Sequence, residues 1–198
     1  MKALPTALLC LLGISCMSAK RREVGAPSEL RSGEVLLIGR IKLTPPIEKN
    51  EQTISGLYPN WRGKVLLLLA DEYRPIQSPV SNSDYRGRIE APAEGEFSVA
   101  VPAASLVILG GVVPLTYVGQ LHDEAFLPGG FRVELRPDDV AVYIGTIHYT
   151  RDEFWQIKDV EVEDDYDRVH ADCLQRWGPD APLRKALVAR SQLENRRR

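Results

Sequence analysis

The chain has 198 residues, of which 44% are hydrophobic and 26% charged, and its formal net charge is -2 at pH 7. This composition is typical of a folded globular protein, and the length fits a single domain with one sizeable core. Domains that bind nucleic acid are generally basic, so the slight negative charge argues against nucleic acid as a partner.

The N-terminal residues predict export. Lys2 gives a positive start, and the apolar run Leu4 to Ile14 is shorter than the roughly 20 residues that a membrane-spanning helix needs. The segment ending in Ser15-Cys16 resembles the lipobox of bacterial lipoprotein signal peptides, although Gly13 stands where leucine is usual. The resemblance implies a signal peptide over residues 1–15 and a lipid on Cys16.

Two other interpretations of this region stay open, namely a cut after Ala19 that releases a soluble secreted protein, and an uncleaved anchor. Met17 after the cysteine resembles the outer-membrane choice in lipoprotein sorting, which makes the periplasmic face of the outer membrane the expected location. Residues 16–32 are polar and lack a periodic apolar pattern, so they predict a flexible lipidated tether.

The three cysteines leave no internal disulfide in the mature chain. Cys10 lies in the predicted signal peptide and Cys16 is the predicted lipid site, so Cys173 remains alone. Cys173 falls on the apolar stripe of a predicted helix, where it is expected to be buried as a small hydrophobic residue.

From Gly33 onward, short segments of alternating apolar residues are separated by proline and glycine, a pattern typical of all-β proteins. Lys64 to Ala70 has no alternation and predicts a central strand that is covered on both faces. Leu127-Pro128-Gly129-Gly130 predicts a type II turn. The remaining predicted strands are Glu34–Leu43, Gly95–Val101, Ser105–Tyr117 (bulged or at an edge), Phe131–Leu135, Val140–Thr150 and a short one at Val160–Val162.

A helix is expected after the last of these strands. Asp164-Asp165 can cap its start and Gly178-Pro179 can end it. Tyr166, Val169, Cys173 and Trp177 recur between them at helical spacing and should pack on the sheet. A second helix is expected over Leu183–Leu193, followed by a basic tail at residues 196–198.

The segment from Gly87 to Pro102 resembles the Gly-x-Phe-x-Val-x-Val-Pro element of carboxypeptidase regulatory-like domains, which are transthyretin-like β-sandwiches. The matching residues are Gly95-Glu96-Phe97-Ser98-Val99-Ala100-Val101-Pro102. The resemblance implies a non-catalytic accessory module. The expected fold is therefore mainly β, an antiparallel β-sandwich of about seven strands with one or two C-terminal α-helices. The sandwich and its closing helix should cover residues 33–178, and the C-terminal helix and basic tail residues 179–198.

The sequence offers few groups for catalysis, and we expect no enzyme, cofactor or metal. His122, His148 and His170 show no i, i+4 pair of the kind that places two imidazoles on one helical face for zinc. The acidic run over residues 159–167 lacks the glycine and the terminal glutamate of an EF-hand loop. The alternative is a metal-dependent hydrolase that assembles His122, His148 and nearby carboxylates.

The best candidate for a contact surface is the aromatic and basic trio Tyr58, Trp61 and Arg62, because these residue types dominate binding energies at interfaces. The alternative is that Trp61 folds back onto the sandwich. The segment Tyr149–Trp155 is a second candidate, although a structural role with Arg151 paired to Asp152 or Glu153 is favoured there. The leading hypothesis is a membrane-anchored envelope lipoprotein that binds a protein or an envelope polysaccharide without catalysis.

Overall fold

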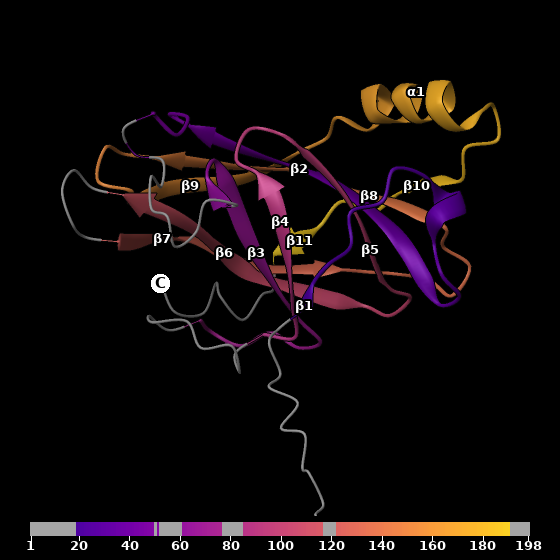
Figure 1. The fold of residues 1–198 in the computed structure, drawn as a ribbon, viewed down its shortest axis with the longest axis horizontal. Coiled ribbons are helices and arrows are strands. Elements are labelled where there is room, and N and C mark those ends of the chain that lie inside the picture. Colours follow the sequence, from indigo (N-terminus) through magenta and orange to yellow (C-terminus); the bar gives the residue numbers. More distant parts are fainter. Residues whose placement is uncertain (1–18, 50, 52–60, 77–84, 117–121, 191–198) are drawn as a thin grey trace, which may run out of the picture.

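The protein is described from a computed structural model, which covers residues 19–49, 51, 61–76, 85–116 and 122–190. Figure 1 shows two facing β-sheets with one α-helix outside them. The elements are β1 (Ala19–Lys20), a short 3-10 helix (Pro27–Glu29), β2 (Glu34–Thr44), β3 (Lys64–Ala70), β4 (Gly87–Pro92), β5 (Glu96–Pro102), β6 (Leu106–Thr116), β7 (His122–Val133), β8 (Ala141–Arg151), β9 (Ile157–Glu163), α1 (Tyr166–Trp177), β10 (Leu183–Lys185) and β11 (Ala189–Arg190).

The mainly β, sandwich-like class is confirmed, but the expectation of about seven antiparallel strands is wrong. A six-stranded sheet has the order β1-β4-β3-β6-β7-β11, and a five-stranded sheet joins β10-β8-β2-β5 with β9 also paired to β8. Three of the pairs are parallel: β1 with β4, β2 with β8, and β10 with β8. Parallel partners are joined by long connections instead of hairpins, so local sequence patterns do not reveal them.

The alternating apolar residues of the predicted strands lie in the core between the two sheets, as expected. In β2, Val35, Leu37, Ile41 and Leu43 belong to the core between the sheets. The unalternating strand β3 is buried on both faces, which confirms its prediction as a central strand. Strand β6 carries the expected bulge, because Leu109 is an extra residue against the consecutive pair Leu68 and Leu69 of β3. It lies between β3 and β7 and is not an edge strand.

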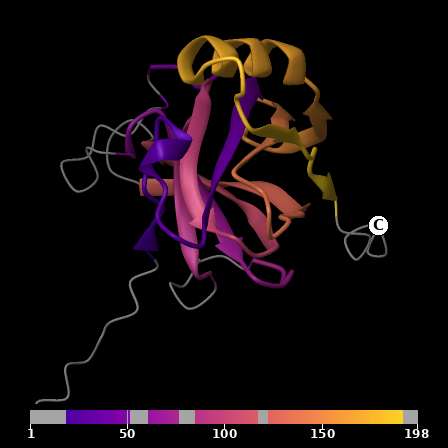
Figure 2. The same ribbon diagram turned by 90° about the vertical axis from the view of Figure 1, so that its right-hand side faces the viewer.

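Helix α1 closes the outer face of the five-stranded sheet (Figure 2). The predicted stripe is confirmed, because Val169 and Cys173 are buried there and Tyr166 and Trp177 pack at the margin. Asp165 stands at the predicted N-cap position, but its carboxylate accepts a hydrogen bond from the Thr146 hydroxyl instead of capping the helix. Burial raises the pKa of the Cys173 thiol, as expected for a packing residue.

The expected C-terminal helix over Leu183–Leu193 is wrong, since β10 and β11 occupy the described part of this region. β10 pairs with the start of β8, and the amides of Ala186 and Val188 donate to the carbonyls of Tyr143 and Ile144. Pairing with a free strand edge outweighs the modest helix propensity of this stretch. Residues 191–198, which include the basic tail, lie outside the described residues.

The tether expected over residues 16–32 is also wrong from Ala19 onward. β1 pairs with β4, the Arg21 amide donates to the Arg88 carbonyl, and the Val24 amide donates to the Ser98 carbonyl on β5. Val24 is only 3% exposed. The segment therefore crosses from one sheet to the other and belongs to the folded domain.

The N-terminal segment is held to β4 by an ion pair between Lys20 and Glu90. The Glu90 side chain is only 5% exposed and lies 3.1 Å from Lys20 Nζ, 3.5 Å from Lys64 Nζ and 3.2 Å from Arg88 Nη2. Burial raises the pKa of the Glu90 carboxyl, but the contacts with Lys20 and Arg88 outweigh it, so the pKa is lowered overall. A carboxylate with a lowered pKa stabilises the fold when it is ionised.

Replacing Glu90 by Gln is expected to lower the free energy of unfolding at pH 7 by about 1–2 kcal/mol, because the charge-assisted hydrogen bonds are lost. Since the folded pKa is depressed, the wild-type advantage is present above the ordinary glutamate pKa of 4.5 and is lost as the pH falls through the folded value. Urea unfolding of both proteins over this pH range measures it. Glu161→Gln, at an exposed position on β9, is the control, and an equal effect of the two substitutions would contradict the role of Glu90.

Candidate functional site

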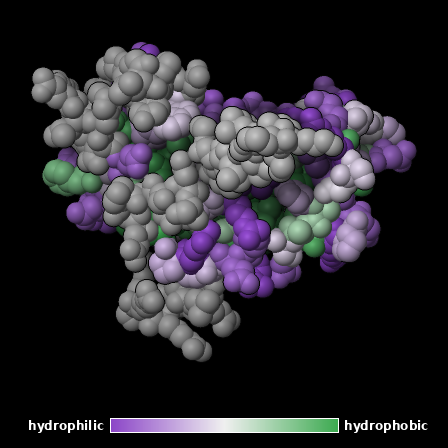
Figure 3. All heavy atoms as spheres, turned by 60° about the horizontal axis from the view of Figure 1, so that its bottom comes forward, coloured by the Kyte–Doolittle hydropathy of each residue, from purple (hydrophilic) through white to green (hydrophobic). Residues whose placement is uncertain are grey.

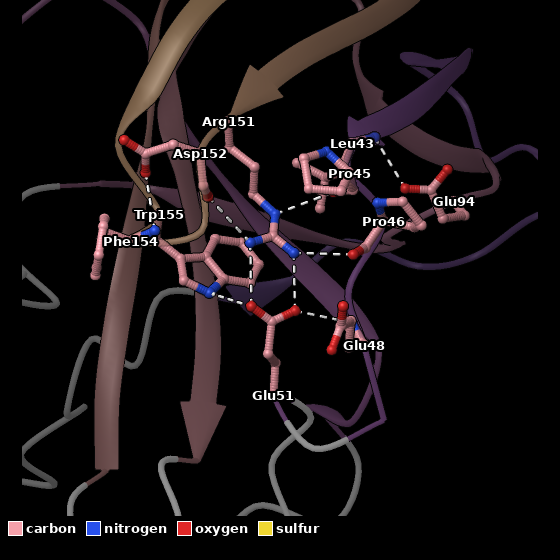
Figure 4. A network of polar contacts seen from close by, with 10 residues as sticks. All are labelled: Leu43, Pro45, Pro46, Glu48, Glu51, Glu94, Arg151, Asp152, Phe154 and Trp155. Carbon is pink, nitrogen blue, oxygen red and sulfur yellow. Dashed lines mark hydrogen bonds and ion pairs between the residues drawn. The ribbon is translucent and has the colours of Figure 1, made fainter.

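The end of β8 holds a buried ion pair between Arg151 and Glu51. The Arg151 side chain is 2% exposed and that of Glu51 17%. Nη1 and Nη2 of the guanidinium donate to Oε1 and Oε2 of Glu51 at 3.1 and 2.8 Å, so the pair is bidentate. Figure 4 shows this arrangement, with the Glu51 carboxylate pointing up toward the guanidinium.

All five N–H groups of Arg151 are used. Besides the two bonds to Glu51, Nε donates to the Pro45 carbonyl at 3.0 Å, Nη2 to the Pro46 carbonyl at 2.8 Å, and Nη1 to the Asp152 carbonyl at 3.3 Å. The guanidinium carbon lies 3.9 Å from the centroid of the Trp155 ring, whose Nε1 donates to Glu51 Oε1 at 2.9 Å. We call Glu51, Arg151 and Trp155 the arginine clamp. Because its donors are satisfied within the protein, the clamp is a structural tie between β8 and the loop that follows β2.

The clamp fixes the turn that joins β8 to β9. Asp152 Oδ1 accepts hydrogen bonds from the amides of Phe154 and Gln156, each at 2.9 Å. Trp155 has a φ of 62°, a left-handed conformation that is uncommon outside glycine. Between these fixed points Phe154 is 73% exposed and points away from the clamp (Figure 4). The turn therefore presents one aromatic ring to the surroundings on a rigid support.

The expected local pairing of Arg151 with Asp152 or Glu153 is wrong. The guanidinium takes only the backbone carbonyl of Asp152, and its carboxylate partner comes from a position 100 residues earlier in the chain. The structural role expected for this segment is supported, since Tyr149, Arg151 and Trp155 are buried.

The outer face of the six-stranded sheet carries an apolar cluster that differs in character from the clamp. Its buried members come from β3 and β6, and its margin is formed by partly buried rings and one isoleucine. We call this surface the aromatic face: Leu66, Leu68, Ala70, Val107, Leu109 and Val112, surrounded by Trp61, Tyr73, Ile76, Tyr85 and Phe126.

A groove of about 460 Å³ opens on the aromatic face. Its floor lies where β7 bulges opposite β6, so that Gly129 and Gly130 face Leu109. The groove is lined by three separate segments whose side chains are mostly apolar, although polar atoms form a substantial part of its surface: Tyr73, Pro75, Ile76, Leu109, Phe126, Leu127, Pro128 and Gly129. A concave apolar surface with aromatic walls is the usual form of a binding pocket, and the volume falls within the common range.

Trp61, the central residue of the predicted contact trio, packs on the aromatic face, and the Arg88 guanidinium lies 5.6 Å from its ring centroid. This position supports the alternative in which Trp61 folds back onto the sandwich. Arg62 is exposed next to it. Tyr58 and the predicted lipid site Cys16 lie outside the described residues. Trp61 thus lies at the margin of the aromatic face, whereas the groove residues Tyr73 and Phe126 carry no local signal in the sequence that marks them.

His148 lies on the outer surface of the five-stranded sheet in a chain of polar contacts. Its Nε2 is 2.8 Å from Thr44 Oγ1, and its Nδ1 is 2.7 Å from Glu163 Oε1. Lys42 Nζ lies 3.0 Å from the same carboxylate oxygen. The hydrogen bond from Lys42, followed by that from His148, lowers the pKa of Glu163 against the opposing effect of burial. Side chains of β2, β8 and β9 thus form a cross-strand network in which the histidine already has two partners.

The ligand set imagined for a hydrolase is not brought together in the part of the chain that the structure describes, which contains no group of three or more His, Cys, Asp or Glu suited to a metal ion. The side chain of His122 lies outside the described residues. The acidic run is divided among separate contacts, with Asp164 paired to Lys185 and Asp165 bonded to Thr146.

No helix among the described residues is long and apolar enough to span a membrane. Comparisons of the chain with protein-family models, with curated proteins and with solved structures gave no match. Function is therefore inferred from the residues and their geometry.

Proposed function

We propose that this chain is an exported, lipid-anchored module of the cell envelope that binds a partner protein or envelope polymer through the aromatic face, without catalysing a reaction. The observation that carries the proposal is the apolar groove between Tyr73, Leu109 and Phe126. Isolated apolar residues are common on protein surfaces, whereas contiguous concave apolar patches generally mark interaction sites.

The composition of the groove favours binding. Tyrosine and phenylalanine supply a large contact area with little side-chain entropy to lose. The two rings differ in support, because Phe126 belongs to β7 whereas Tyr73 follows β3. Since β7 is paired along the bulged β6, the floor and one wall are held by a sheet before a partner arrives. Such preorganisation reduces the cost of association.

The predicted export signal and lipidation site support the same function. The apolar run before Cys16 and the lipobox-like residues indicate transport and acylation, which would hold the module at the periplasmic face of the outer membrane. A buried Cys173 and a fold without disulfides among the described residues are compatible with an oxidising compartment. The expected partner is then a neighbouring component of the cell envelope.

A photo-crosslinking residue placed at Pro75 in the groove tests the proposal in intact cells. We expect one discrete protein adduct, and we expect Phe126→Ala to lower its yield about tenfold, as loss of an aromatic hot spot does. Phe154→Ala is the matched control, because it removes an exposed ring outside the groove. Circular dichroism of both variants confirms that the fold is kept.

The same variants distinguish the two kinds of partner. If the partner is a polymer, no protein adduct forms, but the wild-type protein sediments with purified peptidoglycan and Phe126→Ala does not. Equal behaviour of Phe126→Ala and Phe154→Ala in both assays would show that the groove is not a binding site. An intact mass that shows no acyl group on Cys16 would reject the anchoring part of the proposal.

A further inference from the structure

The first described residues are firmly attached to the edge of the six-stranded sheet. Ala19 pairs with Gly87, Lys20 with Arg88, and the Arg21 amide donates to the Arg88 carbonyl at 2.8 Å. The Lys20 ammonium also reaches the buried carboxylate of Glu90 at 3.1 Å. The chain therefore has a fixed starting point on the folded domain.

Only a short length of chain separates this point from the predicted lipid site. Ala19 is the third residue after Cys16. A fully extended chain spans at most about 3.3–3.6 Å per residue, so the two positions lie at most about 10 Å apart. A freely jointed tether over residues 16–32 would have allowed roughly 20–25 Å and any orientation. The docked N-terminal segment removes that freedom.

The end of the sandwich next to Ala19 has a surface suited to lipid headgroups. One hollow is lined by Arg21, Asp71, Arg86 and the turn between β5 and β6, which shows that these groups are adjacent. The turn, Pro102 to Ser105, is exposed and uncharged. Arg86 is 71% exposed and pairs with Asp71. We call this region the N-terminal pole. Figure 3 is turned so that the bottom of the view in Figure 1 comes forward, and it shows hydrophilic residues at several places on that side of the molecule.

The opposite end of the molecule is far from this pole. β2 starts beside it, since the Ala103 amide donates to the Gly33 carbonyl, and ends at Thr44, which is in register with Thr150 and through it with Asp159. Its 11 residues span about 35 Å at roughly 3.3 Å per residue. Asp159 is exposed at that far end.

From these observations we infer that the N-terminal pole rests on the phospholipid surface, with the Pro102–Ser105 turn and Arg86 at the headgroups and the Asp159 end directed away. This orientation rests on the proposed acylation of Cys16. Arg86 is paired with Asp71, so this pole offers the headgroups a charge pair and an uncharged turn. The short link from Cys16 is what holds this end of the molecule at the surface.

A fluorophore attached at single introduced cysteines tests the orientation. The acylated full chain, carrying Ser105→Cys or Asp159→Cys, is reconstituted in vesicles of phosphatidylethanolamine and phosphatidylglycerol that contain a headgroup-labelled nitroxide lipid. Native Cys173 is 0% exposed, so labelling is confined to the introduced site. We expect strong quenching at position 105 and at least several-fold less at position 159. Insertion of a flexible Gly-Ser spacer of about 20 residues before Ala19 should abolish the difference while the acyl group stays in place.

The intact mass of the protein and the quenching at the two positions together distinguish the possible failures. An intact mass without an acyl group on Cys16 overturns the anchor and the orientation together. An acylated chain in which both positions are quenched equally, or in which position 159 is quenched more, overturns the orientation alone. A difference that survives the spacer shows that surface attraction, and not the short link, sets the orientation, and so overturns the argument from chain length.

Discussion

Replacing Arg151 by alanine is expected to lower the free energy of unfolding by about 3–5 kcal/mol, the usual cost of removing one partner from a buried ion pair. The substitution leaves the Glu51 carboxylate, 17% exposed, without its bidentate partner. The carbonyls of Pro45 and Pro46 also lose their donors, and the Trp155 ring loses the cation above it. Domains of this kind are stable by only about 5–15 kcal/mol, so urea unfolding should detect the change readily.

Two further substitutions identify the cause. Arg151→Lys keeps the positive charge but has a single nitrogen, so it should recover less than half of the loss if the planar five-donor geometry matters. Arg168→Ala removes an arginine whose side chain is 46% exposed and whose partners are Glu96 and Asp172, and it should cost less than about 1 kcal/mol. A loss below about 1 kcal/mol for Arg151→Ala would show that the arginine clamp contributes little to stability.

Local periodicity predicted several of the long strands and the helix of this fold, but not how the strands pair. β2, β3, β5 and β8 lie near their predicted positions because alternating or continuous apolar runs report burial directly. Helix α1 lies between its predicted start and stop for the same reason. The short strands β1, β10 and β11 were missed, since two or three residues have no period and become strands only where a neighbouring edge is free. β4 and the part of β7 before Phe131 were missed as well.

The candidate sites show the same limit. Arg151 and Glu51 are 100 residues apart, and nothing near either residue indicates the other. The groove likewise combines Tyr73, Leu109 and Phe126 from three segments. Trp61 could be singled out because a tryptophan beside an arginine in a loop is informative by itself. Side-chain type thus indicated one residue of the aromatic face, whereas its shape depends on sheet topology.

The predicted type II turn at Leu127–Gly130 is wrong, because a β-bulge within β7 occupies this position. These residues continue β7, and two of them, Gly129 and Gly130, lie opposite the single residue Leu109 in a β-bulge. Gly130 has a φ of 80°, which glycine adopts without strain. A type II turn and this bulge each contain a residue at positive φ, a conformation that favours glycine, so Pro-Gly-Gly does not distinguish them. The bulge brings the backbones of β6 and β7 unusually close and forms the floor of the groove.

Replacing Gly129 by alanine is therefore expected to destabilise the protein by about 3 kcal/mol, the upper part of the usual range for overpacking. A Cβ atom there would lie 2.4 Å from Gly110 N and from Leu109 C and O, which are backbone atoms that cannot move without breaking the β6–β7 pairing. For a chain of this length the melting temperature should fall by roughly 6–12 °C, measurable by differential scanning calorimetry. Gly63→Ala is the matched control: its φ is 64° but nothing lies within 4 Å of the added atom, so only the conformational cost of about 1 kcal/mol applies. Equal melting temperatures for the two variants would mean that β6 and β7 do not approach this closely, and the groove would then lack its floor.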